Sequence, residues 1–162
     1  MSVNPSISAV ISQFNMQVRL YNNVLEGIKS TDSSKQVSDN LNHISWLAGH
    51  LAHSRFSVGT FLGLKDKSPY DEFYKDFKPI DPKLKYPSLE ESKAVFTEIT
   101  GKIMPAFDAV TEEHLSSPIP FEIPIGDSTV RGFLAFLSHH EAYHIGQLAS
   151  LRRSLGYGPM KY

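Results

Sequence analysis

Two histidines four residues apart, His140 and His144, have the clearest chemical potential in the sequence. On a helix their side chains lie one above the other, roughly 5.4 Å apart, so both imidazoles can bind one metal ion. Apolar residues at helical spacing indicate that both point inward: Phe133, Leu137, Leu148, Leu151 and Leu155. Because a buried imidazole needs a hydrogen-bond partner or a ligand, the spacing predicts a metal site. The alternative is a helix whose histidines bond to neighbouring carboxylates or carbonyls.

A third ligand is expected from a second helix, predicted from about Asn42 to Leu64 with Asn40 or Asn42 as its N-cap. His50 lies in the middle of the inward face of that helix. His43 is expected to be solvated or to cap the helix, and His53 is a weaker candidate for a hydrogen-bond partner of the ligands. The predicted metal ligands are therefore His50, His140 and His144.

The stretch from His140 to His144 also matches the HExxH pattern of zinc peptidases. Such enzymes take a third ligand downstream, yet none of the 18 residues after His144 is His, Asp or Glu. Glu141 and His144 form an ExxH element like those of di-iron bundles, but no second glutamate has a histidine three positions later. The sequence thus favours one metal ion and three histidines.

Three neighbouring side chains are candidates for supporting roles. Glu141 is a weak candidate for a catalytic base, because adjacent helical residues point about 100° apart. It is expected instead to orient a ligand or to pair across helices. Tyr143 and Gln147 are candidates for hydrogen bonds that fix the imidazole tautomers, and the alternative for both is packing and surface solvation.

The composition suits one domain over residues 1–162, with 41% hydrophobic residues and no shift in composition along the chain. No apolar run is long enough to cross a membrane and no signal peptide is recognised, so a cytoplasmic protein is expected. The absence of cysteine excludes disulfides and thiolate ligands, and any thiol chemistry needs an external thiol. A net charge of -1 gives no electrostatic footprint for nucleic acid.

Four helices are predicted to position these residues. The first spans about residues 4–29, the second 42–64, and the third begins with a capping box at Ser88 and Glu91. Pro105 is expected to kink or break the third helix. The fourth begins near Ser128 or Thr129 and runs to about Leu155, with Gly156 as its C-terminal cap.

Two connections are long. Residues 65–87 contain four prolines and an aromatic run, which predicts a crossover that packs by its aromatics, with one helical turn around 71–77. A substrate lid is the alternative. Residues 117–127 alternate apolar residues between prolines and are expected to be extended, as a small arm. The predicted fold is all-α, a four-helix bundle with a long crossover between the second and third helices.

The motifs in these helices resemble those of the DinB/YfiT-like superfamily of metal-binding four-helix bundles. The resemblance rests on Trp46-Leu-Ala-Gly-His50 in the second helix and on Thr129-Val-Arg, His140-Glu-Ala-Tyr-His144-Ile-Gly-Gln147-Leu and Arg152-Arg153 in the fourth. It covers nearly the whole chain. It implies one divalent metal ion, usually nickel or zinc, held by His50, His140 and His144, and frequent homodimers.

The resemblance also implies an enzyme class, because relatives include transferases and isomerases that use bacillithiol, mycothiol or glutathione, and others described as hydrolases. Three histidines leave a coordination position for water or substrate. The expected function is metal-dependent transfer of a low-molecular-weight thiol to a small electrophile. The alternatives are metal-dependent hydrolysis, a non-enzymatic metal-binding or stress-associated protein, and a helical scaffold without metal.

Overall fold

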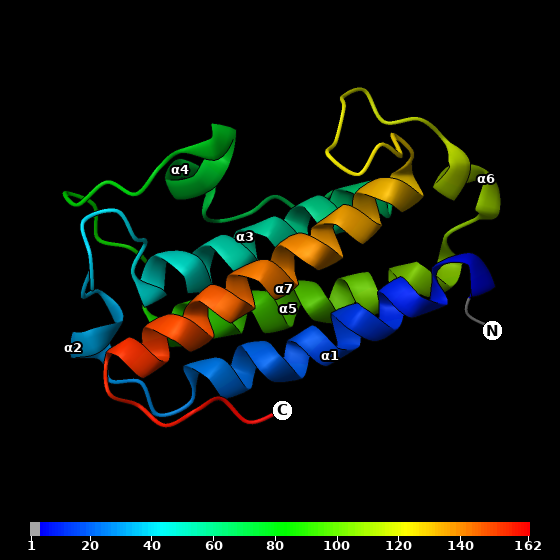
Figure 1. Ribbon diagram of the computed structural model, residues 1–162. Coiled ribbons are helices and arrows are strands. Elements are labelled where there is room, and N and C mark those ends of the chain that lie inside the picture. The colour runs from blue at the N-terminus through cyan, green and yellow to red at the C-terminus, as the bar shows by residue number, and fades with distance from the viewer. Residues whose placement is uncertain (1–3) are drawn as a thin grey trace.

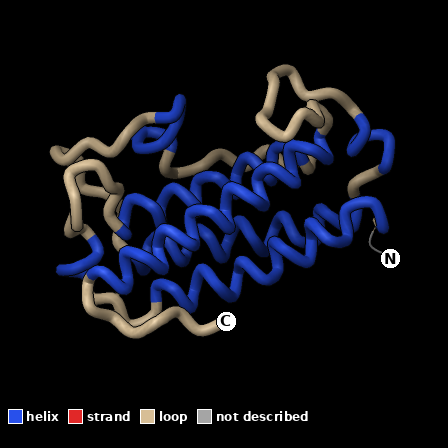
Figure 2. The backbone as a smooth tube through the Cα atoms, viewed as in Figure 1, coloured by secondary structure: helices blue, strands red, loops and turns tan. Residues whose placement is uncertain are grey.

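Four long helices form the body of the molecule, which is described over residues 4–162 by a computed structural model (Figure 1). They are α1 (Ser8–Leu25), α3 (Ile44–Phe61), α5 (Leu89–Ala109) and α7 (Val130–Ser154). The shorter helices are η1 (Pro5–Ile7), α2 (Ser30–Ser33), α4 (Asp71–Tyr74), η2 (Lys75–Phe77) and α6 (Glu112–Ser116). The described residues contain no β-strand (Figure 2), so the predicted all-α four-helix bundle is confirmed.

The direction of the helices explains the long crossover. Helices α1 and α7 run one way along the bundle, whereas α3 and α5 run the other way (Figure 1). Helix α3 packs against α5 and α7, and α7 also packs against α1. Because α3 and α5 are parallel, residues 62–88 must return along the bundle before α5 begins, and α4 lies over α3 on that return path.

The helix ends follow local capping chemistry. Ser88 and Glu91 form the predicted capping box, and the Thr129 side chain caps α7 by accepting from the backbone N–H of Gly132. Gly156 adopts φ 86° after the last turn, as expected of a C-terminal cap. The predicted caps Asn40 and Asn42 are wrong. Helix α3 begins at Ile44, and the cap is His43, whose Nδ1 accepts from the backbone N–H of Trp46 at 3.0 Å.

Pro105 was predicted to kink or break the third helix, and the break is wrong, since α5 continues to Ala109. A proline inside a helix clashes with the carbonyl four residues earlier and leaves it without a donor. That residue is Gly101, which has no side chain and is exposed, so water can satisfy its carbonyl. The predicted first helix extends about four residues too far at its C-terminal end, because α1 ends at Leu25 and Gly27 adopts φ 71°.

The two long connections lie on the same side of the bundle (Figure 1). The crossover contains the predicted helical turn as α4 and η2, and it packs through buried Tyr70, Tyr74 and Tyr86. Residues 117–127, predicted to be extended, form an arm with bends and a turn at 124–126. Its base is one antiparallel bridge between Pro118 and Thr129, in which the Ile119 N–H donates to the Ser128 carbonyl at 2.9 Å.

Helix α3 is buried on most of its surface because the bundle covers one side and the crossover covers much of the other. Its buried residues include several small ones, Ser45, Ala48, Gly49, Ala52 and Gly59. A helix covered on more than one side is not expected to show a single narrow apolar stripe. None of the described helices combines the length and the apolar character that crossing a membrane requires.

Candidate metal centre

The structure brings His50, His140 and His144 together at the seam between α3 and α7. Nε2 of His140 lies 3.1 Å from Nε2 of His50 and 3.0 Å from Nε2 of His144. The three nitrogens that face one another lie within 4.8 Å of one another, and each histidine is half-buried. Among the described residues this group contains three imidazoles and no carboxylate.

Packing and one hydrogen bond fix the rings. The indole of Trp46 stacks on His50, with centroids 4.9 Å apart and 14° between the planes, and Tyr74 meets His50 edge-on. His144 Nδ1 lies 2.7 Å from Oε1 of Gln147, which only accepts, so Nδ1 carries the proton. The lone pair of neutral His144 is then on Nε2 and points to the other two histidines.

Burial keeps these histidines neutral. Burial, together with a smaller effect of the neighbouring imidazoles, lowers the pKa of His50 to about 2 and that of His140 to about 4. Burial also lowers the pKa of His144, although its bond to Gln147 offsets part of the change. A metal ion needs neutral imidazoles as ligands, so the environment favours the binding form.

The geometry fits a divalent metal ion. Nitrogens about 2.1 Å from one ion are about 3.0–3.4 Å apart at angles between about 90° and 109°. The separations of 3.0 and 3.1 Å agree with that range. The buried Nδ1 atoms of His50 and His140 have no hydrogen-bond partner among the described residues, so no bond at Nδ1 orients these two rings.

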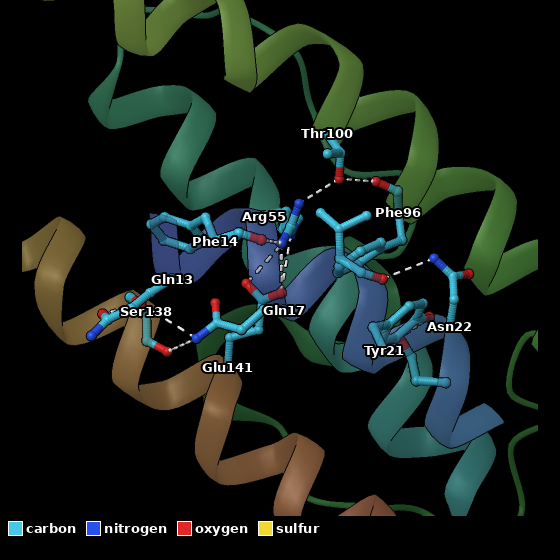
Figure 3. A network of polar contacts seen from close by, with 12 residues as sticks. Gln13, Phe14, Gln17, Tyr21, Asn22, Arg55, Phe96, Thr100, Ser138 and Glu141 are labelled. Carbon is cyan, nitrogen blue, oxygen red and sulfur yellow. Dashed lines mark hydrogen bonds and ion pairs between the residues drawn. The ribbon is translucent and has the colours of Figure 1, made fainter. Parts of the chain in front are cut away.

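Glu141 directly follows His140 in α7, but its side chain is buried in the core of the bundle, where it pairs with Arg55 of α3 (Figure 3). Nη2 of Arg55 donates to Oε1 of Glu141 at 2.7 Å, and both side chains are buried. Burial raises the pKa of Glu141, and the guanidinium offsets part of that rise. The glutamate of the HExxH pattern is thus a partner in a cross-helix ion pair, and it is not placed to act as a base.

The other predicted residues lie at different distances from the group. Gln147 bonds to His144 and also donates through Nε2 to the hydroxyl of Tyr143 at 3.1 Å, which links both to the site. His53 lies outside it. Its Nδ1 is 2.9 Å from Oγ of Ser68, and 3.6 Å from Oδ1 of Asp71 at the start of α4. His53 therefore holds the crossover and does not bond to a histidine of the group.

Sequence reasoning missed Arg55 and Tyr74. Arg55 carries a signal, because it is a charged residue within the apolar face of α3 and therefore needs a buried partner. The sequence signal for Tyr74 is weaker. The aromatic run of the crossover indicates that it packs on the bundle, but it does not indicate which helix it covers. The predicted inward face of α7 was also displaced. Its buried residues include Glu141 and Ile145, whereas His140 and His144 flank them half-buried.

Comparison with known proteins agrees with this arrangement. The sequence matches the DinB superfamily over residues 6–148. The structure is similar to YfiT from Bacillus subtilis, with a TM-score of 0.65 and 18% identity over 97% of this chain and 92% of that chain. That protein is described as "a probable metal-dependent hydrolase with an unusual four-helix bundle topology". At this identity the likeness shows the fold alone. No protein with a curated functional description shows significant sequence similarity.

Proposed function

Because the chain belongs to the DinB superfamily and gathers three imidazoles in its bundle, we propose that it binds one divalent metal ion through His50, His140 and His144. Imidazole ligands suit zinc, nickel, copper and iron, and among these the resemblance to the DinB superfamily favours zinc or nickel. The observation that supports this proposal best is the convergence of three neutral Nε2 atoms at 3.0 and 3.1 Å. A bound ion lowers the pKa of water or a thiol enough to make it a nucleophile near neutral pH.

We propose thiol transfer as the reaction. Hydrolysis of the zincin type uses a carboxylate base beside the metal, but Glu141 is buried against Arg55 and the histidine group contains no carboxylate. A thiol that loses its proton on binding needs no such base. An ion held by His50, His140 and His144 would supply that acidity. In the transfer the thiol sulfur would form a bond to carbon of a small electrophile, the bond from that carbon to the leaving group would break with its electron pair going to the leaving group, and the thiol proton would pass to the buffer. The thiol must be external because the chain has no cysteine.

Metal-dependent hydrolysis is the second candidate, and one observation favours it. YfiT, whose fold is similar, is described as a probable metal-dependent hydrolase. In this reaction water replaces the thiol as nucleophile at the same three histidines. Each histidine of the group is half-buried, and none is sealed in the core.

Metal content tests the proposal first. Tag-free protein is incubated with Zn²⁺ or Ni²⁺, desalted and analysed for bound metal by mass spectrometry, together with His50→Ala, His140→Ala and His144→Ala. His139→Ala is the matched control, because His139 is adjacent to a proposed ligand but exposed. We expect about one equivalent in the wild type and in the control and much less in the three variants, since each loses one of three ligands.

The reaction is then tested with the loaded protein. Glutathione or bacillithiol and a chloronitroarene test thiol transfer, in which a C–S bond replaces the C–Cl bond, and a nitrophenyl ester without thiol tests hydrolysis. Ester turnover without thiol transfer would favour the second candidate. If the metal-loaded protein catalyses neither reaction, the result would favour a non-enzymatic metal-binding protein. Wild-type protein that takes up no metal would contradict the proposal as a whole.

A further inference from the structure

The guanidinium of Arg55, which extends from α3, contacts each of the other three long helices (Figure 3). From α3 it donates to Glu141 of α7, to Oγ1 of Thr100 of α5 at 2.5 Å and to the carbonyl of Phe14 of α1 at 3.3 Å. It also lies over the ring of Phe96, 4.0 Å from the centroid. The Arg55 side chain is 0% exposed, so each of these contacts is shielded from water.

The ion pair joins the two helices that carry the histidines. Arg55 is five residues after His50, and Glu141 directly follows His140. Nε of Arg55 lies 3.2 and 3.3 Å from the two carboxylate oxygens, in addition to the shorter bond from Nη2. A planar guanidinium that meets a carboxylate through two nitrogens fixes direction as well as distance.

Outside the histidines, hydrogen bonds between α3 and α7 are confined, in the part of the chain described, to this ion pair. Apolar side chains make the remaining contacts, and such contacts permit several helix registers. A slip of one residue moves a helix by about 1.5 Å along its axis. Such a slip is large against the 3.0 and 3.1 Å separations of the Nε2 atoms.

We propose that Arg55 and Glu141 are positioning residues that hold α3 and α7 in the register at which His50 meets His140 and His144. The inference rests on the proposed metal binding. It assigns the glutamate of the HExxH pattern a role in metal affinity that acts through helix register, without contact with the metal.

Replacing both partners with apolar residues separates this role from stability. Apolar residues of similar volume often match or exceed the stability of a buried ion pair, whereas removing one partner leaves an unpaired buried charge. The test is therefore the dissociation constant for Zn²⁺, by competition with a chromophoric chelator, in the wild type and in the Arg55→Met, Glu141→Leu double variant. Urea unfolding of the metal-free proteins is measured in parallel, and Co²⁺ absorption reports the number of ligands.

We expect the double variant to unfold at a urea concentration no lower than the wild type but to bind Zn²⁺ at least about tenfold more weakly, comparable to the loss of other groups that support metal ligands. Its Co²⁺ spectrum should shift, because His50 no longer meets the other ligands. Thr100→Val is the matched control. It removes the Arg55 contact to α5 and leaves the pair between α3 and α7 in place, so its affinity should stay within about twofold of the wild type.

The outcomes separate this inference from the proposed function. A wild type that binds no Zn²⁺ contradicts metal binding itself. If the wild type binds and the folded double variant binds equally well, the positioning role is wrong. If Thr100→Val weakens Zn²⁺ binding as much as the double variant does, the positioning role is also wrong. Any loosening of the core would then be enough to weaken Zn²⁺ binding. If the double variant does not fold, Glu141→Gln is measured instead. It keeps the shape of the side chain but removes the charge, and unchanged affinity in its folded fraction contradicts the inference.

Discussion

At the residue scale, Gln147 determines which nitrogen of His144 faces the other histidines. Its Oε1 lies 2.7 Å from Nδ1 of His144, and its Nε2 donates to the hydroxyl of Tyr143. The amide therefore has one partner on each side and holds a defined orientation. His50 and His140 have no such bond among the described residues, so His144 is the histidine whose tautomer depends on a hydrogen bond.

Replacing Gln147 with Leu should weaken Zn²⁺ binding by about tenfold, because groups that orient metal-binding histidines typically contribute that much or more. Tyr143→Phe is the control. It removes the contact to Gln147 but leaves the Gln147–His144 bond, so its effect should be clearly smaller. Chelator competition measures both constants. Equal affinity in the wild type and Gln147→Leu would show that packing alone orients His144.

At the element scale, the crossover is fitted to α3 through Gly49. A Cβ atom at Gly49 would lie 2.2 Å from the Tyr74 hydroxyl oxygen and 3.0 Å from its Cζ. Tyr74 belongs to α4, and its ring also meets Trp46 and His50 edge-on. The absence of a side chain at Gly49 thus lets α4 approach the turn of α3 that carries His50.

Gly49→Ala should lower the free energy of unfolding by about 1–3 kcal/mol, the usual cost of overpacking, although alanine favours a helix by up to about 1 kcal/mol. Gly146→Ala is the matched control. Gly146 lies within α7, and nothing lies within 4 Å of an added Cβ, so this change should stabilise the protein by about 0.5–1 kcal/mol. Urea unfolding of the metal-free proteins measures both changes.

Tyr74→Phe extends this test. The Tyr74 hydroxyl is buried and has no partner among the described residues, so its removal should be neutral or stabilising. It also removes the atom nearest to the added Cβ. The Gly49→Ala, Tyr74→Phe double variant should therefore recover part of the lost stability, as a double-mutant cycle would show. Strictly additive effects would contradict a direct contact between the two positions.

At the scale of the whole molecule, the buried histidines link folding to pH. Burial lowers the pKa of His50 to about 2 and that of His140 to about 4, whereas unfolded histidines titrate near 6.5. Below about pH 6.5 the unfolded chain therefore binds protons that the folded chain does not. Stability that is present above pH 6.5 is lost as the pH falls toward 4.

The free energy of unfolding of metal-free protein should thus fall between pH 6.5 and about 4.5 by up to about 1.4 kcal/mol per pH unit for each such histidine. His50→Leu should reduce that slope by the contribution of one histidine. Urea unfolding in the presence of a chelator, at several pH values, measures both slopes. An unchanged slope in His50→Leu would mean that His50 accepts a proton in the folded protein.

The sequence alone determined what depends on local periodicity. The four-residue spacing put His140 and His144 on one face of α7, the residues Ser88 and Glu91 began α5, and Gly156 ended α7, because these features involve neighbours within one or two turns. The placement of His50 opposite them followed from the inward face of α3. The exact start of α3 did not follow, since Asn40 and Asn42 are commoner caps than His43, for which capping was only one of two expectations.

Only the tertiary structure decided how the helices face one another. It turned Glu141 into the core, set Arg55 against it, and placed Tyr74 of the crossover over Gly49. From sequence alone, a charged residue such as Arg55 is predicted to be exposed unless its partner is known. The partner here, Glu141, is 86 positions away in the chain. Helical periodicity fixes the face on which a residue lies to within about 100°. The register and rotation of packed helices, which the bundle as a whole determines, decide which residue that face meets.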